Sequence, residues 1–462
     1  MIQPSGQILT VAQMRAAEEA LIEAGTSVDA LMQVAGRGAA DWVWRVAAGH
    51  KVTVLCGPGN NGGDGYVIAE AIRERGGAVC VVAACEPKTD AARNAAQQFG
   101  GEVLGPDAVV HGEVLVDCLF GSGLTRALSD DHYALLVRLA AAHHKLVAID
   151  LPSGVDSDSG AGLNDGLPRH DLTVALGAWK FAHFLMPARA LVGPCRLVGI
   201  GVGEWPGAAQ AIGRPQLRRP RHRDNKFTRG LVLLVAGAMP GAAVLAASAA
   251  IRGGAGYVKV AGGQGLPPEI VAVAGDLETA LADARIGAVL VGPGLGRDEA
   301  ARERLEAVLA HPARARVLDA DALNLLGPGM DVAGAVLTPH GGEMAALEAA
   351  FGLDSGLSKP ERARALAVRL GATVVFKGAD TVIAAPDGRL ACGPRAPVWL
   401  AMAGTGDVLA GLMAARLATG AEPFAAACEA VWLHGEAAHL AGPAFTAAEL
   451  AAAVPRALAS AI

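Results

Sequence analysis

The chain has 462 residues and a formal net charge of -6 at pH 7, with 52% hydrophobic but only 4% aromatic residues. This length exceeds one ordinary core, so we expect two domains, with interiors built from Ala, Val, Leu and Gly as in α/β proteins. The mild negative charge and the scattered Lys and Arg residues argue against a nucleic-acid partner. The seven Cys residues stand singly, which argues against zinc sites and disulfide frameworks.

The first residues carry no targeting pattern. The stretch MIQPSGQILTVAQM lacks a basic region followed by an apolar one, and no apolar run of the chain reaches the length of a membrane span. We therefore expect a cytoplasmic protein that does not associate with membranes.

Strand-like apolar runs alternate with helical segments through residues 1–205, after a first helical stretch from Val11 to Trp44. The expected strands are Lys51–Cys56, Ala78–Cys85, Glu113–Phe120, Lys145–Asp150 and Asp171–Leu176, and the expected helices lie near Tyr66–Arg75, Thr89–Phe99 and Asp130–His143. This alternation predicts a Rossmann-like three-layer domain, in which helices cover both faces of a parallel sheet.

A segment rich in Pro, Gly and Arg separates the two halves. Residues 206–225, PGAAQAIGRPQLRRPRHRDN, lack apolar periodicity and predict a linker. Beyond it, strands are expected at residues 230–237, Gly256–Val260, Ala288–Gly292, Arg316–Asp319, Gly334–Leu337 and Thr373–Lys377, and a helix at Val408–Leu417. Residues 226–462 are therefore predicted to form a second α/β domain.

A glycine-rich loop, GPGNNGGDG at residues 57–65, follows the first strand and opens a helix. Amide groups and the helix dipole attract an anion there, which favours a phosphate-bearing dinucleotide. The G-x-G-x-x-G fingerprint is weak alone, because glycines also serve tight turns. Asn60 and Asn61 could coordinate a cation, and Asp64 stands where a phosphate would bind. A plain dehydrogenase is disfavoured, because the sequence shows no convincing pair of His and Arg residues for hydride transfer.

Two further strands deliver aspartates to the same edge of the predicted sheet. Asp117 lies in VDCLFGSGLTR at residues 116–126, and Asp150 lies in AIDLPSG at residues 148–154. Because parallel strands end at one edge, the three motifs should converge on a ligand site. Each aspartate taken alone could instead cap a turn.

Together these motifs resemble the epimerase domain of the bifunctional NAD(P)H-hydrate repair enzymes, over residues 1–205. The resemblance implies that two loops and Asp150 hold the hydrated dinucleotide. The loop residues are Asn60, Asn61, Gly62, Gly63 and Asp64, and Gly121, Ser122, Gly123, Leu124, Thr125, Arg126 and Ala127. The resemblance also implies a potassium ion bound by Asn61, Asp117 and Ser153.

The chemistry of such a site points to one acid/base residue. Inverting the hydroxylated C6 of the nicotinamide ring requires proton transfer at a carbon that the ring nitrogen activates, and Asp150 is the candidate. Lys180 could be a second polar member of the site or a solvated lysine at a strand end.

Four motifs of the second half stand at strand ends or at a helix start. AGTGD at residues 403–407 precedes a helix, so its amide groups can form an anion hole beside Asp407 as base, although acidic first-turn residues are also common. The others are GPGLG at residues 292–296, TPHGGE at residues 338–343 and KGADT at residues 377–381. In GPGLG, the glycines allow a substrate to approach the backbone closely. TPHGGE offers an imidazole that is open to a ligand. KGADT offers a cation and a hydroxyl that suit a nucleotide.

The order of these motifs resembles the ribokinase-like fold, and specifically the dehydratase domain of the same repair enzymes, over about residues 222–462. The resemblance implies that water is removed from (S)-NAD(P)H hydrate with ADP, and that Mg²⁺ accompanies ADP. The implied nucleotide ligands are Lys377, Gly378, Ala379, Asp380, Thr381 and Gly406, the hydrate ligands are Ala242, Gly296, His340 and Asp407, and the anion hole is Gly404, Thr405 and Gly406.

A phosphoryl step explains the need for a nucleotide. Hydroxide leaves poorly, so phosphorylation of the C6 hydroxyl lets phosphate leave instead. Asp407 would accept the hydroxyl proton while Gly404–Gly406 stabilise the phosphoryl group. The resemblance therefore implies an enzyme that epimerises the R and S hydrates of NADH and NADPH and dehydrates the S form, giving AMP and phosphate. We also expect a homo-oligomer.

Two alternatives stay open at this point. A ribokinase-type kinase of small molecules could use the first domain as a regulatory dinucleotide sensor, although TPHGGE fits the dehydratases better. The first domain could also bind a dinucleotide or a partner without catalysis. One departure from the dehydratase pattern is AGAMPGA at residues 236–242, which leaves substrate contacts at Ala238 and Met239 open.

Overall fold

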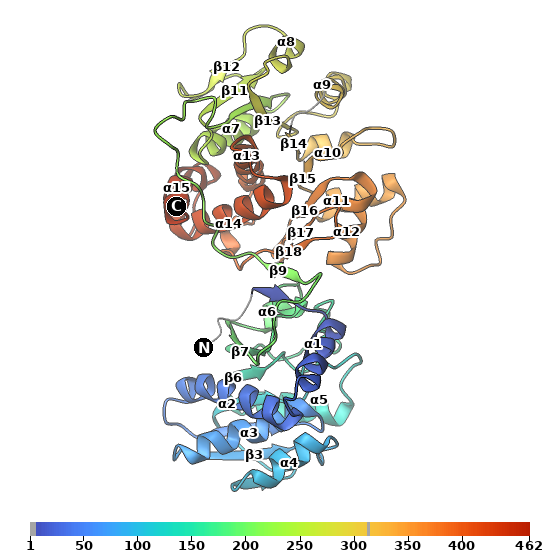
Figure 1. Cartoon of the computed structure of the whole chain (residues 1–462), viewed down its shortest axis with the longest axis vertical. Helices are drawn as coiled ribbons and strands as arrows, with labels where there is room; N and C mark the ends of the chain where they lie inside the picture. Colours follow the sequence, from blue (N-terminus) through green and yellow to red (C-terminus); the bar gives the residue numbers. More distant parts are fainter. Residues whose placement is uncertain (1–5, 312–314) are drawn as a thin grey trace. The chain divides into compact units, whose positions relative to one another are not determined.

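The computed structural model describes residues 6–311 and 315–462, which divide into two compact units between Gln210 and Ala211 (Figure 1). The first five residues of the predicted domain 1–205, which open the stretch tested for a targeting signal, lie outside the described residues. Both units are α/β, and this confirms the predicted fold class.

A seven-stranded parallel sheet forms the centre of unit 1. Its order is β4-β3-β2-β5-β6-β7-β8, and a separate antiparallel pair joins β1 to β9. The strands are β1 (Gln7–Ile8), β2 (Val52–Cys56), β3 (Val79–Ala83), β4 (Glu102–Leu104), β5 (Gly112–Cys118), β6 (His143–Ile149), β7 (Leu172–Leu176), β8 (Cys195–Val198) and β9 (Ala209–Ala211). The order reverses between β2 and β5, which is where open α/β sheets bind ligands.

Helices cover both faces of this sheet. The helices are α1 (Val11–Glu23), α2 (Val28–Ala47), α3 (Asn60–Glu74), α4 (Asp90–Gln98), α5 (Asp130–Ala141), η1 (Phe181–His183) and α6 (Ala188–Leu191). Alternate residues of β2 separate the two layers: Val54 packs in the cluster with α2 and α3, and Leu55 packs in the cluster with α5. The first helical stretch is two helices rather than one, because Ser27 caps the start of α2.

Nine strands of an eleven-stranded sheet form the centre of unit 2, in the order β18-β17-β16-β15-β14-β13-β10-β11-β12. All pairings among these nine are parallel except those of β16 with β17 and β17 with β18. The strands are β10 (Leu231–Val235), β11 (Tyr257–Ala261), β12 (Val271–Ala272), β13 (Ile286–Val291), β14 (Ala315–Leu318), β15 (Val336–Leu337), β16 (Thr373–Phe376), β17 (Val382–Ala384) and β18 (Leu390–Cys392). The strand order reverses between β10 and β13.

Ala-rich helices complete unit 2. They are α7 (Pro240–Arg252), α8 (Leu277–Leu281), α9 (Glu299–Ala310), α10 (Asp321–Leu325), α11 (Gly341–Phe351), α12 (Lys359–Leu370), η2 (Val398–Leu400), α13 (Thr405–Ala418), α14 (Pro423–Ala441) and α15 (Ala447–Ser460). One large core joins α7, α13, α14 and α15 to the sheet. Its alanines let α13 pack closely against α7, which fixes where the α13 N-terminus stands.

The predicted linker 206–225 is partly ordered by contacts. It contains β9, and the Ile212 and Leu217 amides donate hydrogen bonds to the Cys392 and Ala461 carbonyls of unit 2. The boundaries 1–205, 206–225 and 226–462 stay a prediction. Across the described parts of the chain, every helix is too short or too polar to span a bilayer.

Two candidate active sites

The first candidate site lies at the carboxyl edge of the unit 1 sheet, where its strand order reverses. The loop after β2 touches the loop after β5: the Gly57 amide donates to the Cys118 carbonyl at 3.1 Å, and a Cβ at Gly57 would lie 1.8 Å from the Leu119 carbonyl oxygen. Only glycine permits this approach. The two loops predicted to hold the dinucleotide are therefore neighbours.

Much of the predicted glycine loop is helical. Helix α3 begins at Asn60 rather than near Tyr66, so Asn60 to Asp64 form its first turns. The Asn61 side chain is buried, and neither its nitrogen nor its oxygen has a hydrogen-bond partner. A Cβ at Gly121 would lie 3.1 Å both from Asn61 Oδ1 and from Asp150 Oδ2. Asn61, Gly121 and Asp150 therefore meet at one point, from α3 and the loops after β5 and β6.

Asp150 is held by a dense set of contacts. Its backbone has a φ of +66°, its Oδ1 lies 2.5 Å from Lys180 Nζ, and its Oδ2 accepts the Ser122 amide at 3.0 Å. Burial acts to raise the pKa of Asp150, but Lys180 and Ser122 outweigh it, and the pKa is lowered. A left-handed backbone in a residue other than glycine persists only where its surroundings enforce it, and this is common at functional sites.

Lys180 is not a solvated lysine, because it is 1% exposed. Its ammonium also donates to the Leu176 carbonyl at 2.6 Å. His183 braces the same pair: its Nδ1 accepts the Lys180 amide at 2.9 Å, so its Nε2 donates to the Asp150 carbonyl at 2.8 Å. Burial, followed by the charge of Lys180, lowers the pKa of His183 to about 4 and keeps the ring neutral.

Asp117 and Ser153 form a second buried cluster beside the first. Ser153 donates to Asp117 through its amide at 2.9 Å and its hydroxyl at 2.7 Å, and His170 Nε2 lies 3.3 Å from the same carboxylate. Burial favours a raised pKa of Asp117, but His170 and Ser153 reverse it, and the pKa is lowered. The Phe120 amide donates to Ser153 Oγ, which ties the loop after β5 to the loop after β6.

Other predicted ligands of unit 1 surround this centre. Asp64 is buried, and burial followed by the charges of Asp150 and Glu18 raises its pKa well above the usual range. The stretch from Gly121 to Ala127 is an irregular loop, in which Gly123, Thr125, Arg126 and Ala127 are exposed and Gly121, Ser122 and Leu124 are half-buried. Buried groups at the edge are thus flanked by an accessible loop.

The second candidate site lies at the carboxyl edge of the unit 2 sheet. The loop after β10 crosses the loop after β13, where the Met239 amide donates to the Gly294 carbonyl at 2.9 Å. A Cβ at Gly294 would lie 3.1 Å from the Cβ of Ala242, which places that predicted ligand at the same crossing. The Gly296 amide donates to Asp321 Oδ2 at 3.0 Å, so the last residue of the loop is anchored to α10.

The N-terminus of α13 carries the predicted anion hole and base. Gly404 caps the helix with a φ of +89°, which glycine adopts freely. Gly406 and Asp407 lie in the first turn, where amide groups have no partner within the helix. Burial, followed by the charge of Asp319, raises the pKa of Asp407 to about 7. His434 on α14 braces the turn, because its Nε2 contacts the Thr405 carbonyl at 2.9 Å.

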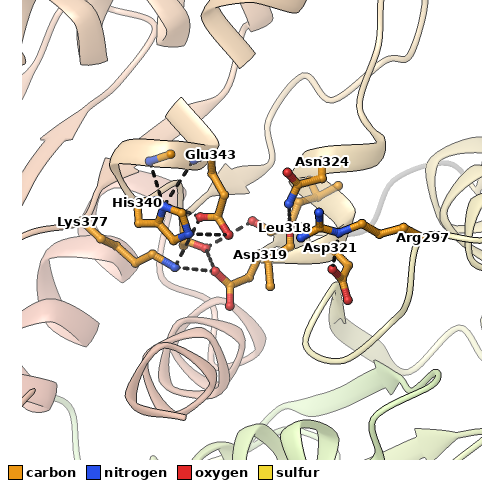
Figure 2. Close-up of polar contacts among 11 residues, drawn as sticks. Arg297, Leu318, Asp319, Asp321, Asn324, His340, Glu343 and Lys377 are labelled. Atoms are coloured by element: carbon orange, nitrogen blue, oxygen red, sulfur yellow. Dashed lines mark hydrogen bonds and ion pairs between the residues drawn. The ribbon is translucent and has the colours of Figure 1, made fainter. Parts of the chain in front are cut away.

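Figure 2 shows Lys377, Asp319, His340 and Glu343 directed toward one another: Lys377 follows β16, Asp319 follows β14, and His340 and Glu343 stand at the start of α11. Lys377 Nζ lies 2.7 Å from Asp319 Oδ1 and 3.9 Å from Glu343 Oε2. Asp319 is 1% exposed and also accepts the Thr338 hydroxyl at 2.6 Å. A Cβ at Gly406 would lie 3.6 Å from Lys377 Nζ, so the ammonium stands at the start of α13.

His340 has an open side chain that is anchored on one side. Its Nδ1 accepts the Gly342 and Glu343 amides and so caps α11, while the ring stays 60% exposed. Glu343 is buried and accepts the His340 amide at 2.8 Å. Burial raises the pKa of Glu343, and Lys377 opposes that shift. His340 Nε2 lies 3.5 Å from Glu343 Oε1, and a ligand can meet the exposed ring without disturbing the cap made by Nδ1.

The predicted nucleotide loop follows β16 as a tight turn. Gly378 and Ala379 are exposed, and the Thr381 hydroxyl donates to the Gly378 carbonyl at 3.0 Å. Asp380 is buried, and its carboxylate lies 2.5 Å from Nζ of Lys359, the first residue of α12. This ion pair ties the turn to α12. The first residue of the loop, Lys377, points instead toward Asp319 (Figure 2).

Several residues of the two sites were missed by the sequence patterns. Asp319 ends the predicted strand Arg316–Asp319, so the strand-end rule that selected Asp117 and Asp150 could have found it. Asp321, whose carboxylate binds the Gly296 amide and the Arg297 guanidinium, follows two residues later. His170 and His183 give no sequence signal, because a lone histidine is usually structural. Among the described residues, no three His, Cys, Asp or Glu side chains form a metal-binding group.

Comparisons with known proteins place relatives on both units. A family model described as NAD(P)H-hydrate dehydratase matches residues 232–459, and one described as YjeF-related protein N-terminus matches residues 28–182. The bifunctional NAD(P)H-hydrate repair enzyme of Gloeobacter violaceus is 37% identical and covers 93% of this chain and 92% of its own. That of Moorella thermoacetica is 33% identical and covers 84% and 83%. The ADP/ATP-dependent NAD(P)H-hydrate dehydratase from Bacillus subtilis, co-crystallised with ATP and Mg²⁺, is 30% identical, with a TM-score of 0.47, and covers 54% and 95%.

Proposed function

The chain belongs to the family of bifunctional NAD(P)H-hydrate repair enzymes, and from this we propose the work of each unit. Unit 1 interconverts the R and S hydrates of NADH and NADPH, and unit 2 removes water from the S hydrate with ADP. The observation that carries this proposal is common to both units: a buried carboxylate contacts a lysine at the sheet edge where ligands bind, Asp150 with Lys180 in unit 1 and Asp319 with Lys377 in unit 2.

In unit 1, Lys180 and Asp150 act on the same ring position. The Lys180 ammonium protonates the hydroxyl on C6 as the electron pair of the ring nitrogen forms a double bond to C6 and water leaves. Water then adds to the opposite face, and Asp150 takes its proton, which returns to Lys180 across their 2.5 Å contact. The lowered pKa of Asp150 supports this role, because a base must be ionised at neutral pH.

A potassium ion fits the oxygen atoms beside this pair. The Asn61 amide oxygen is buried without a partner, which a bound cation would correct. Asp117, near the end of β5, adds a carboxylate, and Ser153, in the loop after β6, adds a hydroxyl; hard cations prefer such oxygen ligands. We assign Asn61, Asp117 and Ser153 to this ion, which would supply positive charge that fastens the substrate loops to α3.

In unit 2, the reaction is a phosphoryl transfer followed by elimination. The C6 hydroxyl oxygen attacks the terminal phosphorus of ADP, the bond to the bridging oxygen breaks, and AMP leaves with that electron pair. Asp407 takes the hydroxyl proton, for which a pKa of about 7 is suited. The C6–O bond then breaks, phosphate leaves with its electron pair, and loss of a proton from the neighbouring carbon restores NAD(P)H.

The remaining predicted ligands of unit 2 frame these atoms. Gly404–Gly406 would stabilise the phosphoryl oxygens with free amides, and residues 377–381 with Gly406 would hold the adenine nucleotide. Ala242, Gly296 and His340 would line the hydrate. Mg²⁺ would be carried mainly by the nucleotide phosphates, because the described residues form no dedicated metal cage. Bound there, it would neutralise phosphate charge.

The test is to mix the enzyme with separated R and S hydrates and to follow the absorbance of the reduced nicotinamide. We expect the S hydrate to be converted fully with ADP and not without a nucleotide. The R hydrate should recover more slowly and through the S form. ATP in place of ADP identifies the donor. Failure to convert the S hydrate with either nucleotide would refute the dehydratase, and an inert R hydrate would refute the epimerase.

A small-molecule kinase makes a different prediction for the same assay. It would leave a stable phosphorylated alcohol and restore no reduced dinucleotide. Product analysis by phosphorus NMR separates the two functions, because the dehydratase releases free phosphate in equal amount to NAD(P)H.

A further inference from the structure

A buried carboxylate that the sequence patterns did not select, Asp319, fixes the position of Lys377. Asp319 follows β14 and is 1% exposed, and it accepts both Lys377 Nζ at 2.7 Å and the Thr338 hydroxyl at 2.6 Å. These bonds tie together the ends of β14, β15 and β16. Burying a charged group costs free energy unless the group is paired with an opposite charge. The contact with Asp319 therefore holds the Lys377 ammonium in one position.

The position so fixed is the start of α13. A Cβ at Gly406 would lie 3.6 Å from Lys377 Nζ, while Gly378 and Ala379 of the predicted nucleotide loop form an exposed turn. A lysine at this place adds a full positive charge to the free amides of the helix start. Such a charge stabilises a phosphoryl group during transfer more than a bound nucleotide, because negative charge collects on the equatorial oxygens.

We infer that Lys377 contacts the phosphoryl group in transfer, and that Asp319 is the positioning residue that holds its ammonium over the N-terminus of α13. The inference rests on the proposed dehydratase function and assigns a separate role to each of three residues. Asp407 takes the proton of the hydroxyl, Lys377 receives the charge of the phosphoryl group, and Asp319 keeps the cation away from the base.

The surroundings explain why the lysine does not pair with Asp407 instead. Among the described residues, five charged or titratable groups besides the lysine face this region: Asp319 after β14, Asp321 on α10, His340 and Glu343 at the start of α11, and His434 on α14. Of the carboxylates, Asp319 has the shortest contact with Lys377 that the described residues show, and Glu343 follows at 3.9 Å. The pKa of Asp407 is therefore set by burial and by the charges of its neighbours.

The experiment measures kcat, KM and ADP affinity of the full chain with the S hydrate for Lys377→Met and Asp319→Asn. We expect Lys377→Met to lower kcat by about 10²- to 10³-fold, as the loss of one preorganised donor does. Asp319→Asn keeps the shape and the Thr338 bond but releases the ammonium, and should lower kcat by about tenfold or more with a small change in KM. ADP affinity, measured by calorimetry, should change less than kcat in both.

The pH profile provides a readout that a purely structural role would not move. The base Asp407 must be ionised, so kcat/KM falls as the pH drops through its pKa. Asp319 raises and Lys377 lowers the pKa of Asp407. The acidic limb should therefore move to lower pH in Asp319→Asn and to higher pH in Lys377→Met. Equal profiles, or kcat at the wild-type level in Asp319→Asn, would overturn the inference.

Two further variants guard against loss of fold. Thr338→Val removes only the second donor to Asp319 and should lower kcat by a few-fold in the same direction. Glu348→Gln breaks a comparable buried pair with Arg362 at 2.6 Å between α11 and α12, and should destabilise the fold while leaving kcat and the pH limb unchanged. If Glu348→Gln lowers kcat as much as Asp319→Asn, positioning is refuted. A wild type without dehydratase activity would instead refute the proposed function.

Discussion

The two candidate sites use the same parts with opposite results. In unit 1 the lysine contacts the carboxylate that is proposed to react: Lys180 lies 2.5 Å from Asp150, and the pKa of Asp150 is lowered. In unit 2 the lysine contacts a second carboxylate: Lys377 lies 2.7 Å from Asp319, and burial raises the pKa of Asp407 to about 7. Burial acts in the same direction at both, so the partner of the lysine decides the outcome.

The difference matches the chemistry proposed for each unit. Inversion at C6 needs an acid and a base at one atom, and a contacting ion pair supplies both. Phosphoryl transfer needs a base at the hydroxyl and a cation at the phosphorus, which are different atoms. A carboxylate that holds the cation elsewhere keeps the base free for its proton.

The strongest way to break this comparison is to remove each reacting carboxylate in turn. Asp407→Asn should lower dehydration of the S hydrate by about 10²- to 10⁴-fold while R and S still interconvert, because only the base of unit 2 is lost. Asp150→Asn should stop use of the R hydrate and leave the S hydrate reactive. Chiral separation of the hydrates measures both rates. Loss of both activities in either variant would contradict two independent sites.

The next test converts the first site to the state of the second. Lys180→Met removes the contact that lowers the pKa of Asp150, so burial should raise that pKa above its ordinary value. We expect epimerisation at pH 7 to fall by about 10²-fold and to recover partly at higher pH. The pH dependence of R and S interconversion measures this. His50→Gln, at an exposed position before β2, serves as a control that should leave the profile unchanged.

The wild-type enzyme should already show the difference between the sites as the pH is lowered. Dehydration should fall about tenfold per pH unit below pH 7, because Asp407 becomes protonated there. Epimerisation should stay nearly constant over the same interval, since the pKa of Asp150 is below its ordinary value. Separate assays of the two reactions between pH 5 and pH 8 check this. If both reactions lost activity over the same acidic pH range, the partner of the lysine would not determine the pKa of the base.

The smallest expected effect concerns Asn61 and potassium. In a buffer without potassium, Asn61→Ala should raise the free energy of unfolding by about 1 kcal/mol, because it removes a buried amide without partners. Potassium should stabilise the wild type and not the variant, since ligands that bind only the folded state shift its stability. Thermal unfolding in potassium and in choline chloride measures both. Equal potassium effects in the two proteins would refute the assignment.

The sequence by itself predicted most of the parallel strands and the strand-end or helix-start placement of most candidate site residues. Asp117 and Asp150 could be selected because residues that end parallel strands reach one edge, and Asp407 because free amides follow from a helix start. These are local properties of the chain. The start of α3 at Asn60 was missed, because glycines weaken a helical pattern and only the close approach of Gly57 to Leu119 shows why the chain turns there.

Only the tertiary structure decided which charges pair. Lys180 looked equally like a solvated lysine, and Lys377 looked like a nucleotide ligand without a carboxylate partner. Their contacts join residues 30 and 58 positions apart in the chain, across different strands. Because the pKa of a buried group depends on the charges within a few ångströms, the sequence could name the carboxylates but not assign their protonation. That assignment is what separates the two sites.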